Sequence, residues 1–139
     1  MTLAASESPV LGNRGVYDVN VAVSDAEVAD MLRLVRTSGA PQMIAKWRSQ
    51  DRGAVPRHPG GRPPKVSDTS ILAVIYLLAA QAAPQNVNAM TSLTLYGLSD
   101  AARQMLSIDV ENVSPDSLNM RLWRAYHRLL AVVDPHPGP

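Results

Sequence analysis

The stretch SDTSILAVIYLLAAQAA, residues 67–83, decides the fold of this chain. Ser67 or Asp68 is placed to cap a helix, because short polar side chains accept hydrogen bonds from the first free amides of a helix. The residues that follow are apolar on every side of the helix rather than along one stripe, which is typical of a buried helix. Pro84 ends it. We therefore expect a central, buried helix from about residue 68 to residue 83.

Further helices are expected on both sides of this central helix. Ser24 and Glu27 have the spacing of a capping box, and Gly39 supplies a stop for the helix that follows. Pro41 suits the first turn of a short helix, and Ser114 is placed to cap the last helix. The expected ranges are 25–38, 42–50, 87–96, 99–106 and 115–133.

The composition favours helices over strands. The chain has 139 residues, of which 46% are hydrophobic and 18% are charged, so there is enough apolar material for one packed domain. Phe is absent and aromatic residues are few, whereas a β-rich domain carries more aromatic and β-branched residues. The fold class expected is therefore all-α: a small helical bundle with a helix-turn-helix-like block and a Pro/Gly-rich basic linker.

The chain divides into five expected segments around a helix-breaking stretch. Residues 53–66, GAVPRHPGGRPPKV, contain four prolines and three glycines, a density that no helix survives. This stretch is either a linker or an extended segment that contacts a ligand. The segments are a flexible arm (1–23), an N-terminal helical pair (24–52), the basic linker (53–66), a helical DNA-binding block (67–134) and a tail (135–139).

Several function classes lose support because their residues are missing. The chain has no Cys, which excludes thiolate catalysis, disulfides and thiol-ligated metal sites. His58, His127 and His136 have no partner at metal-ligand spacing, and neither a nucleophile elbow nor a P-loop occurs. Asp109 and Glu111 are two carboxylates in one loop, which is weak evidence for a shared metal ion. We expect no enzyme activity, no cofactor, no metal and no small-molecule substrate.

The sequence also shows no membrane segment. Its longest apolar run, residues 71–80, is about half as long as a bilayer crossing requires. The N-terminus has no basic start followed by an apolar run, so we expect no secretory signal and a cytoplasmic protein without a membrane partner.

Positive charge is concentrated in one part of the chain. The whole sequence has 13 basic and 12 acidic side chains, a net charge of +1. Between Lys46 and Lys65 there are six basic residues and one acid, a local net charge of +5, which leaves −4 for the rest. A basic segment of this kind suits a phosphate backbone, because neutralising each phosphate releases condensed counterions.

Within this segment, residues 60–65 read GGRPPK. A Gly-Arg-Pro core can lie extended in the minor groove of A·T-rich DNA, where the narrow groove attracts arginine. The segment resembles an AT-hook, whose core is Arg-Gly-Arg-Pro, but it has Gly60 where that core has its first arginine. Arg57, Arg62 and Lys65 are therefore candidate DNA contacts. The alternative is a solvated hinge whose charges only keep it soluble.

The last expected helix provides a second positive feature. Since helical residues advance by about 100° each, Arg121, Arg124 and Arg128 fall within one stripe, opposite an arc of leucines. Each guanidinium can bind a phosphate or a guanine edge with two hydrogen bonds. This helix is our candidate for the major groove, and the helix at 99–106, with Arg103, is the second candidate. The alternative is an ordinary amphipathic helix with a solvated face.

Three stretches between residues 60 and 139 carry a resemblance to a known family. They are GGRPPKVSDTSILAVIYLLA (60–79), GLSDAARQML (97–106) and SLNMRLWRAYHRLLAVVDPHPGP (117–139). These stretches resemble the N-terminal region of actinobacterial insertion-sequence transposases. The resemblance implies a helix-turn-helix-like DNA-binding region that precedes a catalytic domain with an acidic metal-binding triad. That domain would begin after the tail, so no residue of the triad is carried over to this chain.

Two hypotheses follow. The first is a DNA-binding protein, a transposase-like N-terminal region without the catalytic domain, with double-stranded DNA as its partner. The second is a small phage or mobile-element protein that acts through protein–protein interaction, with residues 25–38 and 42–50 as its docking surface and Trp47 as an anchor. The sequence leaves open whether two copies form a homodimer.

Overall fold

The computed structural model describes residues 21–52 and 64–133. All regular structure in this part of the chain is helical, which confirms the all-α class. The expected tail, nearly all of the expected arm and most of the linker lie outside the described residues. The elements are α2 (Asp25–Ser38), α3 (Ala40–Arg52), α4 (Asp68–Ala80), α5 (Val87–Ser92), the π-helix η3 (Leu93–Gly97), α6 (Asp100–Met105) and α7 (Pro115–Val133).

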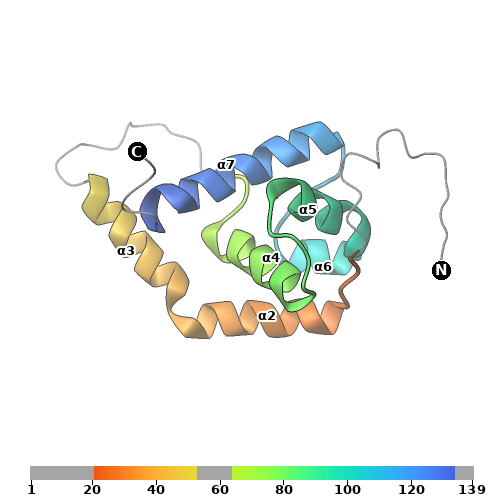
Figure 1. The fold of residues 1–139 in the computed structure, drawn as a ribbon, viewed down its shortest axis with the longest axis horizontal. Helices are drawn as coiled ribbons and strands as arrows, with labels where there is room; N and C mark the ends of the chain where they lie inside the picture. Colours follow the sequence, from red (N-terminus) through yellow and green to blue (C-terminus); the bar gives the residue numbers. More distant parts are fainter. Residues whose placement is uncertain (1–20, 53–63, 134–139) are drawn as a thin grey trace.

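Helix α4 is the centre of the fold, as its apolar sequence predicts. It lies between α2 and α7, with α3 at one end of the molecule and α5 and α6 at the other (Figure 1), and it contacts α2, α3, α5 and α7. Most of its side chains are buried, including Ile71, Val74 and Leu78. The buried helix therefore organises the other elements around it.

Helix α4 ends earlier than expected, at Ala80 rather than at Ala83. The chain turns through Ala82, whose φ of 54° is left-handed. The amide of Ala83 then donates back to the carbonyl of Leu78 over 2.9 Å, so the end of the helix is closed by its own backbone. The proline at 84 follows this turn and does not itself terminate the helix.

Helix α2 begins and ends where its capping residues indicate. The Ser24 hydroxyl accepts from the Glu27 amide (3.2 Å), and the Glu27 carboxylate accepts from the Ser24 amide (2.9 Å), which lowers the pKa of Glu27. Gly39 caps the end of α2 with a left-handed φ of 81°. Buried Val28 of α2 and Ile44 of α3 belong to the same hydrophobic core as α4 and α7. The helical pair and the block after the linker thus share one core.

The helix expected at 87–96 is instead two elements, because α5 passes into the π-helix η3. A π-turn leaves carbonyls without their usual partners, and the Arg103 guanidinium donates to those of Thr94 (2.9 Å) and Leu98 (2.8 Å). The Asp100 carboxylate holds the same guanidinium. This local structure depends on a side chain from the next helix, so the pattern within residues 87–96 does not reveal it.

The chain before α2 packs onto the end of η3. The Val23 amide donates to the Gly97 carbonyl over 3.0 Å. A Cβ placed on Gly97 would overlap with the carbonyl oxygen of Val21 and would press on the Leu93 side chain. Glycine is therefore required at this position by close approach of the backbone.

We expect Gly97→Ala to destabilise the protein by about 1–3 kcal/mol, because the added methyl group must push residues 21–23 away. Amide hydrogen exchange measures this directly, and Val23 should become less protected. Gly39→Ala is the control, because a Cβ there meets nothing within 4 Å and only the left-handed φ is strained. Unchanged protection of Val23 in the Gly97 variant would contradict this packing.

Candidate nucleic-acid interface

One carboxylate joins three helices. Asp68, the first residue of α4, accepts two hydrogen bonds from the Arg48 guanidinium of α3, at 2.7 Å to Oδ2 and 3.0 Å to Oδ1. The Arg128 guanidinium of α7 donates to the same Oδ1 over 3.2 Å. The side chains of Arg48 and Asp68 are each only 13% exposed, and that of Arg128 is 30% exposed. We call this group the Asp68 network.

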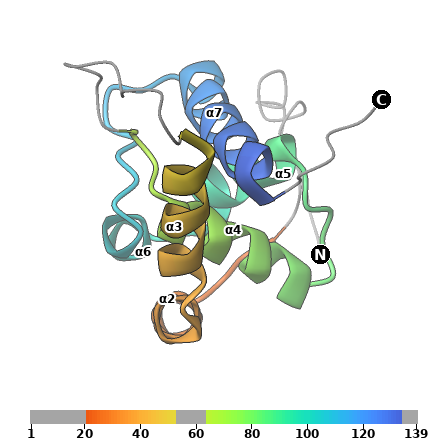
Figure 2. The same cartoon turned by 90° about the vertical axis from the view of Figure 1, so that its left-hand side faces the viewer.

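The Asp68 network joins the two ends of the basic segment, residues 46–65, which we call the basic loop from here on. Arg48 lies near the start of residues 46–65, and Asp68 follows their end by three positions. The bidentate bond between these two side chains therefore holds both ends of the segment together, and the bond from Arg128 places α7 at the same point. Figure 2 shows the chain that leads into α4 beside α3 and below α7. The base of the basic loop thus lies against α7.

The candidate DNA contacts fall into three groups in the structure. Arg57 and Arg62 lie outside the described residues. Lys65 and Arg124 are exposed and Arg121 is half-buried, and in the described part of the chain none of the three has a carboxylate partner. Arg128 is different, because its guanidinium is bound by Asp68.

The bond from Arg128 to Asp68 changes how the arginine stripe of α7 is interpreted. The Arg128 guanidinium shares the Asp68 carboxylate with Arg48, so its positive charge is already partly neutralised and it is turned toward the protein. Its local role is to fix α7 on the start of α4. This partner was missed in the sequence because Asp68 also suits the first turn of a helix, where the helix dipole alone explains an acid.

Helix α7 has two different flanks on either side of its buried face. Its buried residues include Leu118, Leu122 and Leu129. At about 100° per residue, Arg121 lies on the flank that carries the bond to Asp68. Asn119 lies on the opposite flank, where its amide donates to Asn88 (3.1 Å) and Thr91 (2.8 Å) of α5. The cationic flank and the α5-facing flank therefore look toward different sides of the molecule.

The remaining cations of the described helices are mostly used within the fold. Arg33 pairs with Asp30 on the surface of α2, with both side chains highly exposed. Arg103, in the second helix considered for the major groove, is bound by Asp100 and by backbone carbonyls. Among the cations whose side chains are described, those without a carboxylate partner are Arg36, Lys46, Lys65, Arg121 and Arg124.

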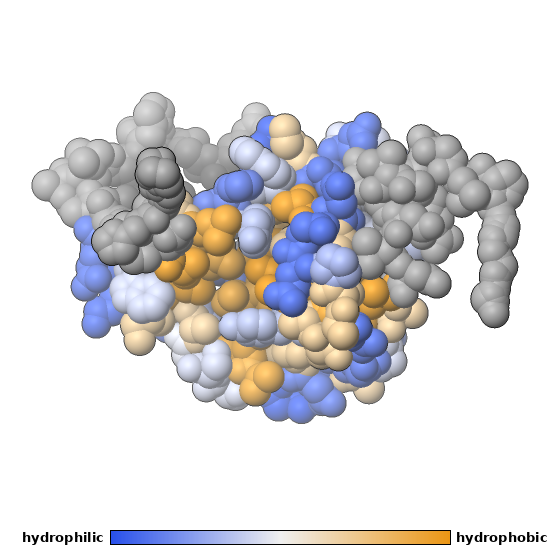
Figure 3. All heavy atoms as spheres, in the orientation of Figure 1, coloured by the Kyte–Doolittle hydropathy of each residue, from blue (hydrophilic) through white to orange (hydrophobic). Residues whose placement is uncertain are grey.

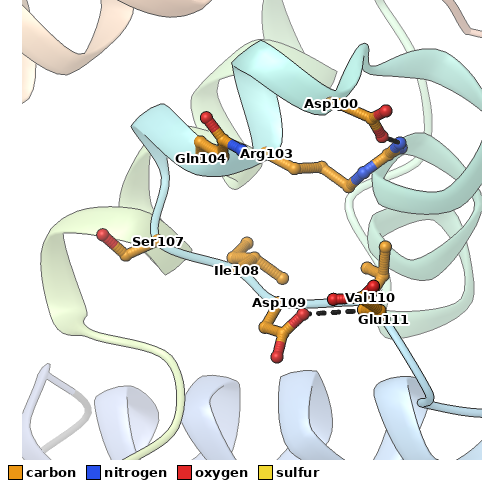
Figure 4. A pocket seen from close by; sticks show the side chains of 8 residues that line it. All are labelled: Asp100, Arg103, Gln104, Ser107, Ile108, Asp109, Val110 and Glu111. Atoms are coloured by element: carbon orange, nitrogen blue, oxygen red, sulfur yellow. Dashed lines mark hydrogen bonds and ion pairs between the residues drawn. The ribbon is translucent and has the colours of Figure 1, made fainter.

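A depression of about 690 Å³ lies between α6 and the connector that leads to α7 (Figure 4). Its lining includes the acids Asp100, Asp109 and Glu111. The Asp109 carboxylate accepts from the Glu111 amide over 2.9 Å, which accounts for its position. In the described residues no group of three His, Cys, Asp or Glu side chains is placed to hold a metal ion. The acidic lining does not suit a phosphate backbone.

None of the helices in the described ranges combines the length and the apolar character needed to cross a membrane.

Comparisons with protein-family models, curated proteins and solved structures gave no match. The function is therefore inferred from the geometry of the chain itself.

We expect Asp68→Ala to lower the free energy of unfolding by about 3–5 kcal/mol, because it leaves two guanidiniums at a largely buried site without their shared carboxylate. Asp30→Ala is the matched control, since it removes an acid from a pair whose side chains are 70% and 73% exposed, and it should cost less than about 1 kcal/mol. Urea unfolding measures both values. Equal losses of stability in the two variants would show that the Asp68 network does not hold the helices together.

Proposed function

We propose that this chain is a DNA-binding protein that grips duplex DNA with its basic loop and with the arginine-bearing flank of α7. One observation supports this proposal above the others. The Asp68 network brings the base of a segment with a net charge of +5 against the helix that carries Arg121 and Arg124. Cations from distant parts of the sequence are thus available to one stretch of phosphate backbone.

In this proposal, the contacts divide by their chemistry. Lys65, Arg121 and Arg124 bind phosphates, and Arg57 adds a further cation from the loop. Arg62, within the AT-hook-like residues 60–65, enters an A·T-rich minor groove. Arg128 positions α7 rather than contacting DNA.

The helical block then acts as a helix-turn-helix-like reader, with α7 as the helix that approaches the major groove. Arg124 is exposed on α7, whereas Arg103 of α6 is occupied within the fold, and this contrast favours α7. The resemblance to the N-terminal region of insertion-sequence transposases agrees with such a role in a mobile element. We propose a cytoplasmic protein with no catalytic activity of its own in this chain.

A second candidate function is a protein–protein interaction, including a homodimer. Met43 and Trp47 of α3 are 47% and 42% exposed, and their spacing places them on one face of the helix. Leu34 of α2 is 58% exposed. Figure 3 also shows hydrophobic side chains gathered over the C-terminal part of α7 and the neighbouring part of α4. These features favour a docking surface as the alternative.

The first test removes two guanidiniums from α7. Arg121→Ala with Arg124→Ala should weaken binding to a short A·T-rich duplex and reduce the slope of log affinity against log salt by about 0.9 for each phosphate that is no longer neutralised. Fluorescence anisotropy across a salt series measures both quantities. Arg33→Ala with Arg36→Ala is the matched control, because it removes the same charge from α2.

Equal effects of the α7 and α2 double variants would contradict a specific role for α7. If the protein does not bind duplex DNA even at low salt and elutes as a stable dimer in size-exclusion chromatography, the result would support the protein–protein interaction instead.

The second test removes two cations from the loop. Arg62→Ala with Lys65→Ala should also weaken duplex binding and flatten its salt dependence, since both side chains are assigned to the DNA. The preference for A·T-rich over G·C-rich duplex should fall as well, because Arg62 is the residue assigned to the minor groove. Unchanged affinity for duplex DNA at low salt would show that the basic loop does not contact the DNA.

A further inference from the structure

Helix α7 carries three aromatic rings in contact, of which Trp123 and His127 are exposed and Tyr126 is half-buried. Trp123 is 46% exposed, and its ring lies 4.2 Å from that of His127, centroid to centroid, at an angle of 46°. Tyr126 contacts the same imidazole edge-on, with centroids 5.6 Å apart. One part of the Trp123 ring is thus supported by the helix itself, and nearly half of the side chain faces solvent.

The neighbours of Trp123 on α7 are a mixture of polar and apolar side chains. At about 100° per residue, its neighbours on the surface of α7 are Asn119, Met120, Tyr126 and His127, and Met120 is the one large apolar side chain among them that is strongly exposed. A protein-docking surface needs a contiguous apolar centre. Trp123 and Met120 alone provide little of it, whereas one exposed ring is enough to stack on a single base.

An aromatic ring beside unpaired cations suits a nucleic acid with unstacked bases. Proteins that bind single strands hold the phosphates with basic side chains and stack the bases on exposed aromatic rings. In a continuous duplex the base faces are covered by neighbouring bases, so a ring on a helix reaches a base face only where a strand is unpaired. Arg124 follows Trp123 directly and points about 100° away from it. His127 lies between them on the surface of α7, at i+3 from Arg124 and i+4 from Trp123, so the Trp123–His127 ring pair borders Arg124. A strand whose phosphate contacts Arg124 can therefore lay its next base on this ring pair.

We propose that the Trp123–His127 ring pair stacks on an unpaired base, so that the preferred ligand is duplex DNA with a single-stranded extension. This inference rests on the proposed DNA-binding function and names the substrate class within it. The duplex part is held by the cationic flank of α7, and the extension crosses the outer face of α7.

The experiment compares a blunt duplex with the same duplex carrying a short thymine overhang. The wild-type protein should bind the overhang substrate about tenfold more tightly, the effect expected for a base stacked on an aromatic ring. Trp123→Ala should abolish this preference while leaving blunt-duplex affinity unchanged, and Trp123→Phe should retain most of it. Trp47→Ala is the matched control, because Trp47 has similar exposure (42%) and lies on α3.

Fluorescence gives a second measurement in the same protein. The chain has two tryptophans, so Trp47→Phe leaves Trp123 as the reporter. Its emission should be quenched by the overhang substrate and much less by the blunt duplex. Circular dichroism checks that each variant keeps its helices, which is expected because both side chains are exposed.

The outcomes separate the two proposals. Equal wild-type affinity for both substrates overturns the stacking inference and leaves the DNA-binding proposal standing. Absence of binding to either substrate overturns both. If Trp123→Ala instead changes self-association and not the overhang preference, the ring belongs to a protein interface and the inference is wrong.

Discussion

The structure depends on the sharing of one carboxylate by two guanidiniums. Asp68 is the first residue of the helix at the centre of the core. It binds Arg48, which lies 20 positions earlier in the chain, and Arg128, which lies 60 positions later. A lone aspartate at a site with 13% exposure would lose hydration without compensation, and so would the guanidiniums. The carboxylate and the two guanidiniums satisfy one another's hydrogen bonds, and this fixes α3 and α7 against the start of α4.

This arrangement connects the charge pattern of the sequence to the shape of the molecule. The sequence of residues 53–66 predicts no helix or strand that would bring the residues on either side of it together. The bond between Arg48 and Asp68 holds these two sides together. The start of α4, which follows Lys65 by three positions, therefore lies beside α7, and for this reason the proposed interface combines residues that are far apart in the chain.

Local signals in the sequence predicted much of the fold. The burial of α4 followed from its apolar residues, the start of α2 from Ser24 and Glu27, and the start of α7 from Ser114 and Pro115, since each depends on neighbouring residues only. The π-helix did not follow, because it depends on Arg103 and on the close approach of Val21 to Gly97. Such tertiary contacts have no local pattern.

The candidate site was also predicted only in part from the sequence. Helical spacing correctly placed Arg121, Arg124 and Arg128 away from the leucines of α7. It could not show that Asp68 would hold Arg128, because that pairing is decided by how α7 packs on the start of α4. The exposure of Trp47 was equally hidden, since a tryptophan within an amphipathic segment suits either a core or a surface.

The most direct test of a DNA interface built around the Asp68 network is a nuclear magnetic resonance titration of ¹⁵N-labelled protein with a short A·T-rich duplex. The largest amide shift changes are expected at residues 64–68 and 121–128, around the Asp68 network, and the outer surface of α2 should be unaffected. Changes confined to α2 and α3, with residues 64–68 and 121–128 unmoved, would contradict it.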